Sequence, residues 1–435
     1  METLIIRHGC PVDPDITDER PRTVFIRNGR IDRILTEQEE SAHDLPHGDG
    51  ARVVDAAGMM LLPGLADAHV HFRDPGFTEK EDMETGAAAA AHGGFTSAVM
   101  MGNTNPHPDT PERVAAMADR AGRTGIRLYC CGNITMGMAG RELTDFEALK
   151  DAGVVLLSDD GLPIRDAGLM EKACIRAASL GLILSLHEED PAFIEQAGIN
   201  RGSVAGSKGL AGADREAEIS MVRRDTAIAE RTGAELTIQH ISAAESVCLI
   251  RDAKRRGVKI HAEATPHHFT LTEEAVIRFG TNAKMNPPLR TEADRLEIIK
   301  GLQDGTIDMI ATDHAPHTQA EKAVEFTKAP SGIIGLETAL SLVWRELVLP
   351  GYLTVPQAVE RMTRAYSVYG LPGGKIREGA PADLVLFAPD EQWTVSDETL
   401  YSRARNTPFL GTSLPGVVRL TVCGGRIVFE NRKEE

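Results

Sequence analysis

Eight short apolar runs alternate with helix-like segments through the middle of this 435-residue chain. The apolar runs lie at 65–71, 95–101, 126–133, 153–158, 182–187, 235–240, 258–263 and 307–312, and segments with helical spacing include 81–92, 111–121, 167–180 and 214–232. Eight strand-then-helix units in this length are typical of a TIM (β/α)8 barrel, although an open doubly wound sheet shows the same alternation. The number of units favours the barrel.

The two ends of the chain have a different character, with short strand-like pieces joined by turns. Such pieces occur at 3–7, 23–27 and 30–35 and again at 382–387, 417–422 and 426–429. Asn28-Gly29 is a two-residue hairpin signal, and Gly424-Gly425 marks a second turn. We expect both ends to pair into one small β-sandwich domain, which gives the domains 1–57, 58–371 and 372–435.

Composition limits the classes of function. The formal net charge of −17 and the aromatic content of 4% argue against a nucleic-acid partner, which needs a basic face and stacking platforms. Six cysteines are scattered without Cys-x-x-Cys spacing, which favours a reducing compartment. The first residues do not resemble a signal peptide and no apolar run is long enough to cross a membrane, so we expect a cytoplasmic protein with no membrane partner.

Metal-ligand residue types stand at the ends of five expected strands. The first run carries His69 and His71, which share a face because side chains alternate along a strand. The other ends are Asp159-Asp160, His187, His240 and Asp313. One histidine after an apolar run is more often a structural residue, but a barrel gathers the carboxyl ends of its strands on one face. The set therefore predicts a metal site.

The ligand types indicate which metal and which chemistry to expect. Imidazole and carboxylate ligands suit Zn²⁺, and this number of ligands can hold one or two ions. A bound ion lowers the pKa of its water to roughly 7, which supplies hydroxide at neutral pH. Asp313 could then act as general acid and base, or it could be purely a ligand, and the two roles are compatible.

With these residues in place, the chain resembles the class I dihydroorotases of the metal-dependent amidohydrolase superfamily. The resemblance covers nearly the whole chain, and it depends on the runs DAHVHFRDPG (67–76), MGNTNP (101–106), SDDG (158–161), TPHH (265–268), MNPPLR (285–290), TDHAPH (312–317) and GIIGLET (332–338). Gly102 stands where a proline is usual in that family.

The resemblance implies a ligand set and a departure from many relatives. The implied metal ligands are His69, His71, Asp160, His187, His240 and Asp313. Many relatives bridge two metals with a modified lysine after strand four, but Lys150 precedes that strand here. An aspartate would have to bridge, if any residue does, and we expect Asp160 in that role and Asp159 as a solvated or capping carboxylate.

The resemblance also implies a substrate and the residues that bind it. The substrate would be a cyclic ureide whose carboxylate is held by Arg73, Asn103, Asn286 and His317. The residues themselves allow other roles. The two asparagines could form hydrogen bonds with backbone groups of their loops, and Arg73 could form a surface ion pair with Asp74 or Glu79. The loop at 322–335 could close over substrate or be a static surface loop.

The implied activity is the reversible cyclisation of N-carbamoyl-L-aspartate to L-dihydroorotate in de novo pyrimidine biosynthesis. Two alternatives are another cyclic amidase (a hydantoinase or an allantoinase) and a non-catalytic partner of aspartate carbamoyltransferase. Arg73 and the missing strand-four lysine disfavour the first, and the complete ligand set disfavours the second. The sequence leaves open a homodimer and a complex with aspartate carbamoyltransferase.

Overall fold

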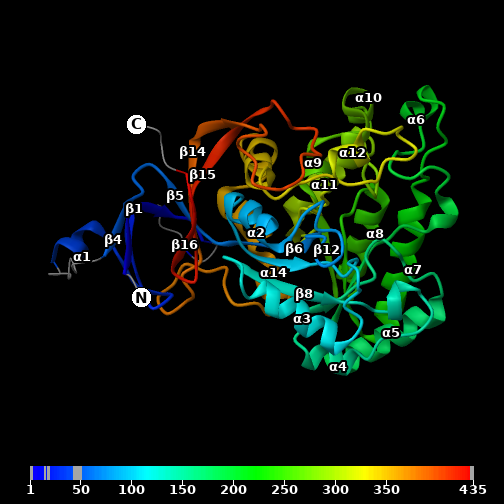
Figure 1. Ribbon diagram of the computed structural model, residues 1–435, viewed down its shortest axis with the longest axis horizontal. Coiled ribbons are helices and arrows are strands. Elements are labelled where there is room, and N and C mark those ends of the chain that lie inside the picture. Colours follow the sequence, from blue (N-terminus) through cyan, green and yellow to red (C-terminus); the bar gives the residue numbers. More distant parts are fainter. Residues whose placement is uncertain (1–2, 14–15, 17–19, 43–50, 432–435) are drawn as a thin grey trace.

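The computed structural model describes residues 3–13, 16, 20–42 and 51–431, and Figure 1 shows a barrel beside a smaller sheet. The barrel strands are β6 (Leu65–Val70), β7 (Phe95–Met100), β8 (Arg127–Gly132), β9 (Leu156–Leu157), β10 (Ile183–Leu186), β11 (Glu235–Ile238), β12 (Ile260–Ala264) and β13 (Met309–Ile310). The strands of the smaller sheet are β1 (Leu4–Pro11), β2 (Arg22–Arg27), β3 (Arg30–Leu35), β4 (Arg52–Asp55), β5 (Met60–Pro63), β14 (Leu384–Thr394), β15 (Ser413–Cys423) and β16 (Arg426–Glu430).

Apart from the first helix, which lies against β2 and β3 of the terminal sheet, the helices surround the barrel (Figure 1). They are α1 (Glu37–Ala42), α2 (Met83–His92), α3 (Pro111–Ala121), α4 (Phe146–Asp151), α5 (Ala167–Leu180), α6 (Ser203–Ser207), α7 (Glu216–Thr232), α8 (Ala244–Arg255), α9 (Pro266–Thr270), α10 (Ala275–Phe279), α11 (Glu292–Asp304), α12 (Gln319–Lys322), α13 (Ala339–Val343) and α14 (Val355–Val368). Short 3₁₀ or π turns are η1 (Met136–Met138), η2 (Pro191–Phe193), η3 (Gly280–Ala283) and η4 (Trp344–Val348).

The barrel prediction is confirmed by the order of its strands. Within the described residues, β6 to β13 pair in parallel and in sequence order, without the reversal of order that defines a doubly wound sheet. The last strand returns to the first, because the His71 N–H donates to the His314 carbonyl oxygen over 2.8 Å. β6 and β7 are buried along their whole length, as expected for strands covered on both faces.

Local sequence signals explain where the helices begin and end. Asp82 caps α2 in a capping box with Thr85, and Pro111 opens α3 at a position where proline is favoured. Asp166 caps α5, and Gly181 ends it in the left-handed conformation that glycine adopts most easily. The helical segments expected at 111–121 and 167–180 therefore have the bounds of α3 and α5.

The terminal sheet joins both ends of the chain, as expected. Its order is β16-β15-β14-β5-β1-β2-β3, with β4 also paired to β1. A register shift between Ile6 and Gly9 divides β1, so that its first half pairs with β4 and its second half with β5. Apolar side chains from both ends of the chain, including Leu4, Val24 and Leu384, pack into one cluster. Both predicted turns are present, with positive φ at Asn28-Gly29 and Gly424-Gly425.

The chain passes from the terminal sheet into the barrel at Gly64. A Cβ at this position would lie 2.2 Å from the Thr96 Oγ1 atom, so only glycine fits between β5 and β6. β5 lies on the barrel side of the boundary expected at 57/58, yet it pairs with β1 and β14. The domain bounds stay a prediction. Parts of the ranges 1–57 and 372–435 lie outside the described residues.

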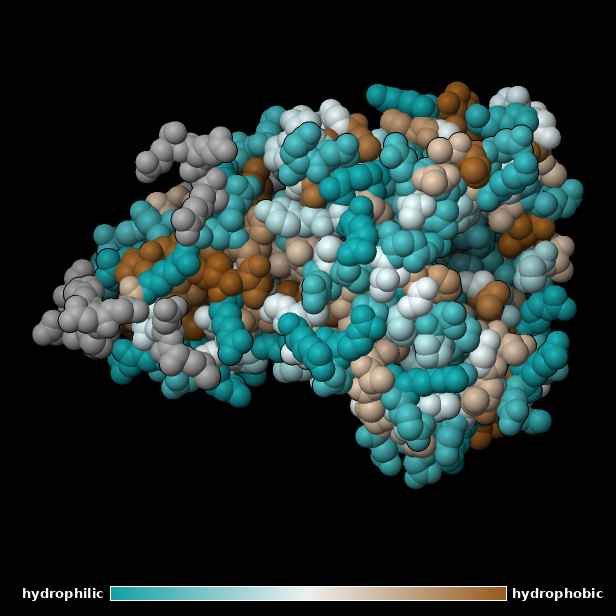
Figure 2. Space-filling view, in the orientation of Figure 1, coloured by the Kyte–Doolittle hydropathy of each residue, from teal (hydrophilic) through white to brown (hydrophobic). Residues whose placement is uncertain are grey.

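The surface is mainly hydrophilic on the face drawn in Figure 2, where the largest brown area lies over β1 and β16 of the terminal sheet. None of the helices in the described part of the chain is both long and apolar enough to span a bilayer.

Candidate active site

The strand ends bring the six expected ligand side chains into one buried cluster. His69 is the last residue but one of β6 and His71 follows the strand directly, whereas Asp160, His187, His240 and Asp313 stand one to three residues beyond β9, β10, β11 and β13. Every one of these six side chains is buried. The structure therefore places them together at the carboxyl face of the barrel, where barrel enzymes carry their chemistry.

Asp160 lies at the centre of four imidazoles. Its Oδ1 atom is 3.5 Å from His69 Nε2, 3.5 Å from His187 Nδ1 and 3.8 Å from His240 Nε2. Its Oδ2 atom is 3.3 Å from His71 Nε2. Two donor groups result, His69-His71-Asp160 and Asp160-His187-His240, and the donor atoms within each lie within 4.8 Å of one another. Asp160 belongs to both groups.

Asp313 approaches the first of these groups from the last strand. Its Oδ1 atom is 3.0 Å from His71 Nε2 and 3.6 Å from His69 Nε2. Asp313 has a φ of 46° and His240 a φ of 31°, a left-handed conformation that non-glycine residues adopt rarely. Such local strain is retained where the surrounding structure fixes it, and it is common at functional sites.

Each of three histidines is oriented by a polar partner on its outer nitrogen. Asn103 Oδ1 lies 2.9 Å from His71 Nδ1, Glu263 Oε2 lies 3.4 Å from His69 Nδ1, and Glu189 Oε2 lies 3.2 Å from His187 Nε2. These partners leave the opposite nitrogen facing Asp160, the arrangement that metal-ligating histidines commonly show.

One ring nitrogen of this cluster lacks a hydrogen bond to any residue that the structure describes. The His69 Nε2 atom is fully buried and has no hydrogen-bond partner among the described residues. Buried polar atoms in native proteins are nearly always partnered, so this nitrogen, facing two carboxylates, fits a cation between them. The donor set of imidazoles and carboxylates is also one that binds divalent metals.

The electrostatics of the cluster keep its carboxylates ionised. Burial alone raises the pKa of Asp160, but His69, His187 and His240 hold it well below its usual range. The pKa of Asp313 is likewise lowered, against the effect of burial, by His71 and His69. Burial opposes charge on the imidazoles too, yet Asp160 and Glu189 raise the pKa of His187 to about 10. Two ionised carboxylates therefore face the imidazoles, whose bound protons compensate the negative charge that a cation would otherwise balance.

Three of the four expected substrate-binding residues gather on one side of this cluster. Arg73 Nε donates to the Pro316 carbonyl over 3.3 Å, and its Nη2 atom lies 3.5 Å from His317 Nε2. Ser331 Oγ donates to Asn286 Oδ1 over 3.0 Å, and the Ser331 carbonyl accepts from His317 over 2.9 Å. Burial and the Arg73 charge lower the pKa of His317 to about 3, so its ring is neutral.

The fourth, Asn103, is bonded to the ligands instead. Its Nδ2 atom lies 3.5 Å from Asp160 Oδ2, and its Oδ1 atom bonds His71. The surface ion pair considered for Arg73 is not formed with Asp74, which pairs with Arg120. The roles of these residues toward substrate stay predictions.

Asp159 points away from the cluster and caps the loop after β8. Its carboxylate accepts from the backbone N–H groups of Ile134 and Thr135, at 2.9 and 3.2 Å. The residue is buried, so the expectation of a capping carboxylate is confirmed and that of a solvated one is wrong.

Two buried lysines hold the loop that covers Asn286 and His317. Lys322 Nζ donates to the carbonyls of Pro330 and Gly332, at 2.9 and 3.0 Å. Lys284 Nζ donates to the carbonyls of Phe326 and Ala329. The loop at 322–335 is thus tied down at the rim of the site, and its closure over substrate stays a prediction.

Sequence reasoning missed the outer partners of the histidines. Neither Glu189 nor Glu263 was among the site residues expected from the sequence. Glu263 ends the seventh apolar run, and an acidic residue at the end of a strand is the signal that identified Asp160 and Asp313.

Comparisons with known proteins agree with this geometry. The family described as Dihydro-orotase-like matches residues 58–246. Relatives named dihydroorotase include one from Clostridioides difficile (strain 630), 48% identical over 98% of this chain and 99% of its own length. Another, from Lactococcus lactis subsp. lactis, is 45% identical over 98% of this chain and 99% of its own.

The chain belongs to the dihydroorotase family. Solved structures with the same fold include a dihydropyrimidinase from Brevibacillus agri NCHU1002, with a TM-score of 0.84 at 25% identity, covering 99% of this chain and 95% of that one. An L-hydantoinase from Arthrobacter aurescens superposes with a TM-score of 0.87 at 23% identity, over 99% and 96% of the two chains. Membership in the dihydroorotase family makes the protein a cyclic amide hydrolase that acts on a small molecule, and its buried His and Asp groups suit a metal ion.

Proposed function

We propose that this protein is a zinc-dependent dihydroorotase that interconverts L-dihydroorotate and N-carbamoyl-L-aspartate in de novo pyrimidine biosynthesis. The observation that carries the proposal is the pair of donor groups that share Asp160, with Asp313 beside one group and Arg73 at the rim. Relatives of this name, 43–48% identical over nearly the whole chain, support the same reaction.

Two zinc ions fit the donor set better than one. His69, His71 and Asp313 would hold the first ion, His187 and His240 would hold the second, and Asp160 would contact both. Nitrogen and carboxylate donors favour Zn²⁺ over harder cations, which prefer oxygen ligands alone. When bound, the ions supply Lewis acidity toward the water nucleophile and the amide carbonyl.

Asp313 moves the proton in this scheme. In the hydrolytic direction, its ionised carboxylate accepts a proton from the attacking water and delivers it to the ring nitrogen that leaves. The lowered pKa of Asp313 keeps its carboxylate ionised at neutral pH. In the cyclising direction, Asp313 takes the proton from the carbamoyl nitrogen, which attacks the side-chain carboxyl group, and returns it to the departing water.

Arg73, Asn286 and His317 orient the substrate. A guanidinium binds a carboxylate through two parallel hydrogen bonds, so Arg73 suits the carboxylate of dihydroorotate. Burial lowers the pKa of Arg73, and the Asp313 and Asp160 charges counteract that effect. Ser331 contacts both Asn286 and His317, which supports a position of the substrate carboxylate beside the 322–335 loop.

The test combines metal analysis with an assay on three substrates. We expect two equivalents of zinc per chain and turnover of dihydroorotate far above that of hydantoin or allantoin. Preference for hydantoin or allantoin would instead indicate another cyclic amidase, and full zinc content without turnover would indicate a non-catalytic partner. The cytoplasmic location, a homodimer and a complex with aspartate carbamoyltransferase stay predictions.

A further inference from the structure

The 395–412 connection between β14 and β15 leaves the terminal sheet and lies against the barrel (Figure 1). Several of its side chains are buried, among them Ser402 and Asn406, and its apolar residues Leu400, Ala404 and Phe409 pack in a cluster with Ile333 and Ile334. We call residues 401–406 the brace. The contacts of the brace converge on the loop that follows β13, which carries Asp313 and His317.

The first contact runs through Glu81 to His314, the neighbour of Asp313. The Ser402 hydroxyl donates to Glu81, and the Arg403 N–H lies 3.1 and 3.2 Å from the two Glu81 oxygens. Glu81 Oε2 lies 3.4 Å from His314 Nε2, and both side chains are completely buried.

The hydrogen bond to the other ring nitrogen gives the tautomer of His314. The Gly335 N–H donates to His314 Nδ1 over 3.2 Å, so Nδ1 is the acceptor and Nε2 carries the hydrogen that faces Glu81. Burial opposes a charge on Glu81, but hydrogen bonds from His314, Ser402 and Thr85 lower its pKa. The His314 ring is thereby fixed at both nitrogens, and with it the peptide that turns Asp313 into its left-handed conformation.

The second contact runs through Asn406 to His317. Asn406 Nδ2 donates to the carbonyls of Ala315 and Gly332, at 3.0 and 3.1 Å, and Asn406 Oδ1 accepts from the His317 N–H over 3.0 Å. One buried amide therefore joins the residues around His317 to the covering loop.

We propose that the brace positions two functional groups separately: Glu81, with Ser402 and His314, places Asp313 for proton transfer, and Asn406 places His317 for substrate binding. Glu81 and Asn406 are positioning residues, since neither is proposed to touch substrate. The proposal rests on the proposed function for its kinetic part, whereas the effect on metal binding does not depend on it.

The Glu81 contact and the Asn406 contact should affect the kinetics differently. Glu81→Gln keeps the shape of the side chain and removes its charge, so we expect kcat to fall about 10- to 100-fold while KM stays within about threefold. Because Asp313 is also a proposed ligand, zinc affinity should weaken about 10-fold or more in a chelator competition. Asn406→Ala should raise KM about 10-fold, with kcat and zinc affinity within about threefold.

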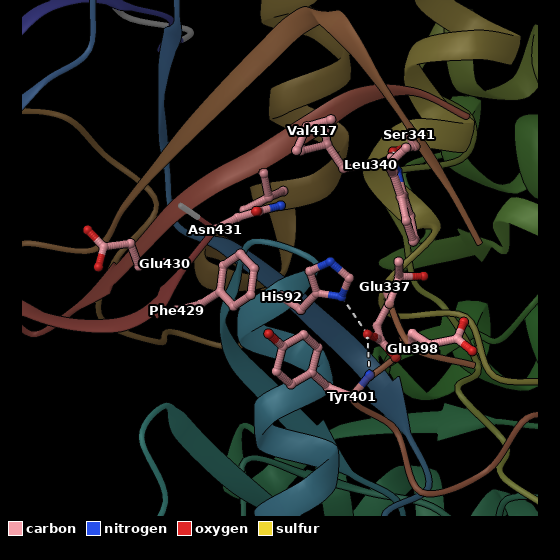
Figure 3. A pocket seen from close by; sticks show the side chains of 13 residues that line it. His92, Glu337, Leu340, Ser341, Glu398, Tyr401, Val417, Phe429, Glu430 and Asn431 are labelled. Carbon is pink, nitrogen blue, oxygen red and sulfur yellow. Dashed lines mark hydrogen bonds and ion pairs between the residues drawn. The ribbon is translucent and has the colours of Figure 1, made fainter. Parts of the chain in front are cut away.

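Glu337→Gln is the matched control. Glu337 is a second buried carboxylate that accepts from the backbone of the brace, at Tyr401 and Ser402, over 2.8 and 3.0 Å. Its other side-chain contact among the described residues is with His92, drawn as a dashed line in Figure 3. We expect this variant to lose thermal stability with kcat, KM and zinc affinity within about twofold of the wild type.

The outcomes separate the proposals. Equal kinetic effects of Glu81→Gln and Glu337→Gln, or unchanged kcat and zinc affinity in a folded Glu81→Gln, would overturn the positioning role. Should Glu81→Gln not fold, Ser402→Ala removes one donor to the same carboxylate and should lower kcat and zinc affinity by a smaller factor; no change would count against the proposal. A wild type inactive on dihydroorotate, with zinc binding still weakened by Glu81→Gln, would reject the function and keep the positioning.

Discussion

Replacing Asp313 by asparagine separates its two proposed roles. The substitution keeps the shape of the side chain and one oxygen beside His71, which lies 3.0 Å away, but it removes the group that accepts a proton. Positioned acid–base groups contribute about 10²- to 10⁴-fold to rate, which is about 3–5 kcal/mol of activation free energy. We therefore expect kcat to fall by at least about 100-fold in both directions of the reaction, with zinc bound more weakly but still held by the remaining donors at high added zinc.

The assay follows the interconversion of dihydroorotate and N-carbamoyl-aspartate across a range of added zinc. If Asp313 were a ligand alone, Asp313→Asn would lose metal and regain activity at high zinc. If Asp313 transfers the proton, activity stays low when the metal sites are full. Turnover within about tenfold of the wild type in a fully loaded variant would remove Asp313 from the mechanism.

Asp159, which follows the fourth barrel strand, provides a matched control. Asp159 is buried like Asp313 but accepts from the backbone of Ile134 and Thr135 instead of facing the imidazoles. We expect Asp159→Asn to leave kcat within about threefold and zinc content unchanged.

Three further predictions test the rim, the histidine partners and the loop. Arg73→Met should raise KM for dihydroorotate roughly 10- to 100-fold, the range expected for hydrogen bonds to a charged group, with little change in melting temperature; unchanged KM would exclude carboxylate binding there. Glu263→Gln should weaken zinc binding about 10- to 100-fold, because Glu263 orients His69; equal affinity in a chelator titration would contradict this. Burial and the Lys284 charge lower the pKa of Lys322 to about 7 from 10.5, so the folded chain binds fewer protons than the unfolded chain between these values. The free energy of unfolding of the wild type, relative to Lys322→Met, should therefore rise by about 1 kcal/mol per pH unit above pH 7 in denaturant titrations, and a flat difference would refute the shift.

The barrel could be predicted because its signals are local. The barrel strands are short, mainly apolar and mostly buried runs, and helices between them carry their own caps, such as Asp82 and Asp166. The ligand types at strand ends were readable for the same reason, since a barrel brings all such ends to one face.

The rest depends on contacts between distant residues. Glu263 meets His69 across 194 positions and Ser402 meets Glu81 across 321, and no local pattern announces either pair. Asn103 could be placed near the site from its motif, but its bonds to His71 and Asp160 required the folded structure. The chain passes from one sheet to the other at Gly64, and only the fold shows that β5 pairs with β14 whereas β6 pairs with β7.

The central claim is that the strand ends converge on a cation site shared through Asp160. Anomalous diffraction at the zinc absorption edge, from crystals grown with zinc, tests it most directly. The account predicts two peaks, one among His69, His71 and Asp313 and one beside His187 and His240, with Asp160 between them. Crystals with ample zinc that show no peak among these side chains, or peaks only elsewhere on the molecule, would contradict it.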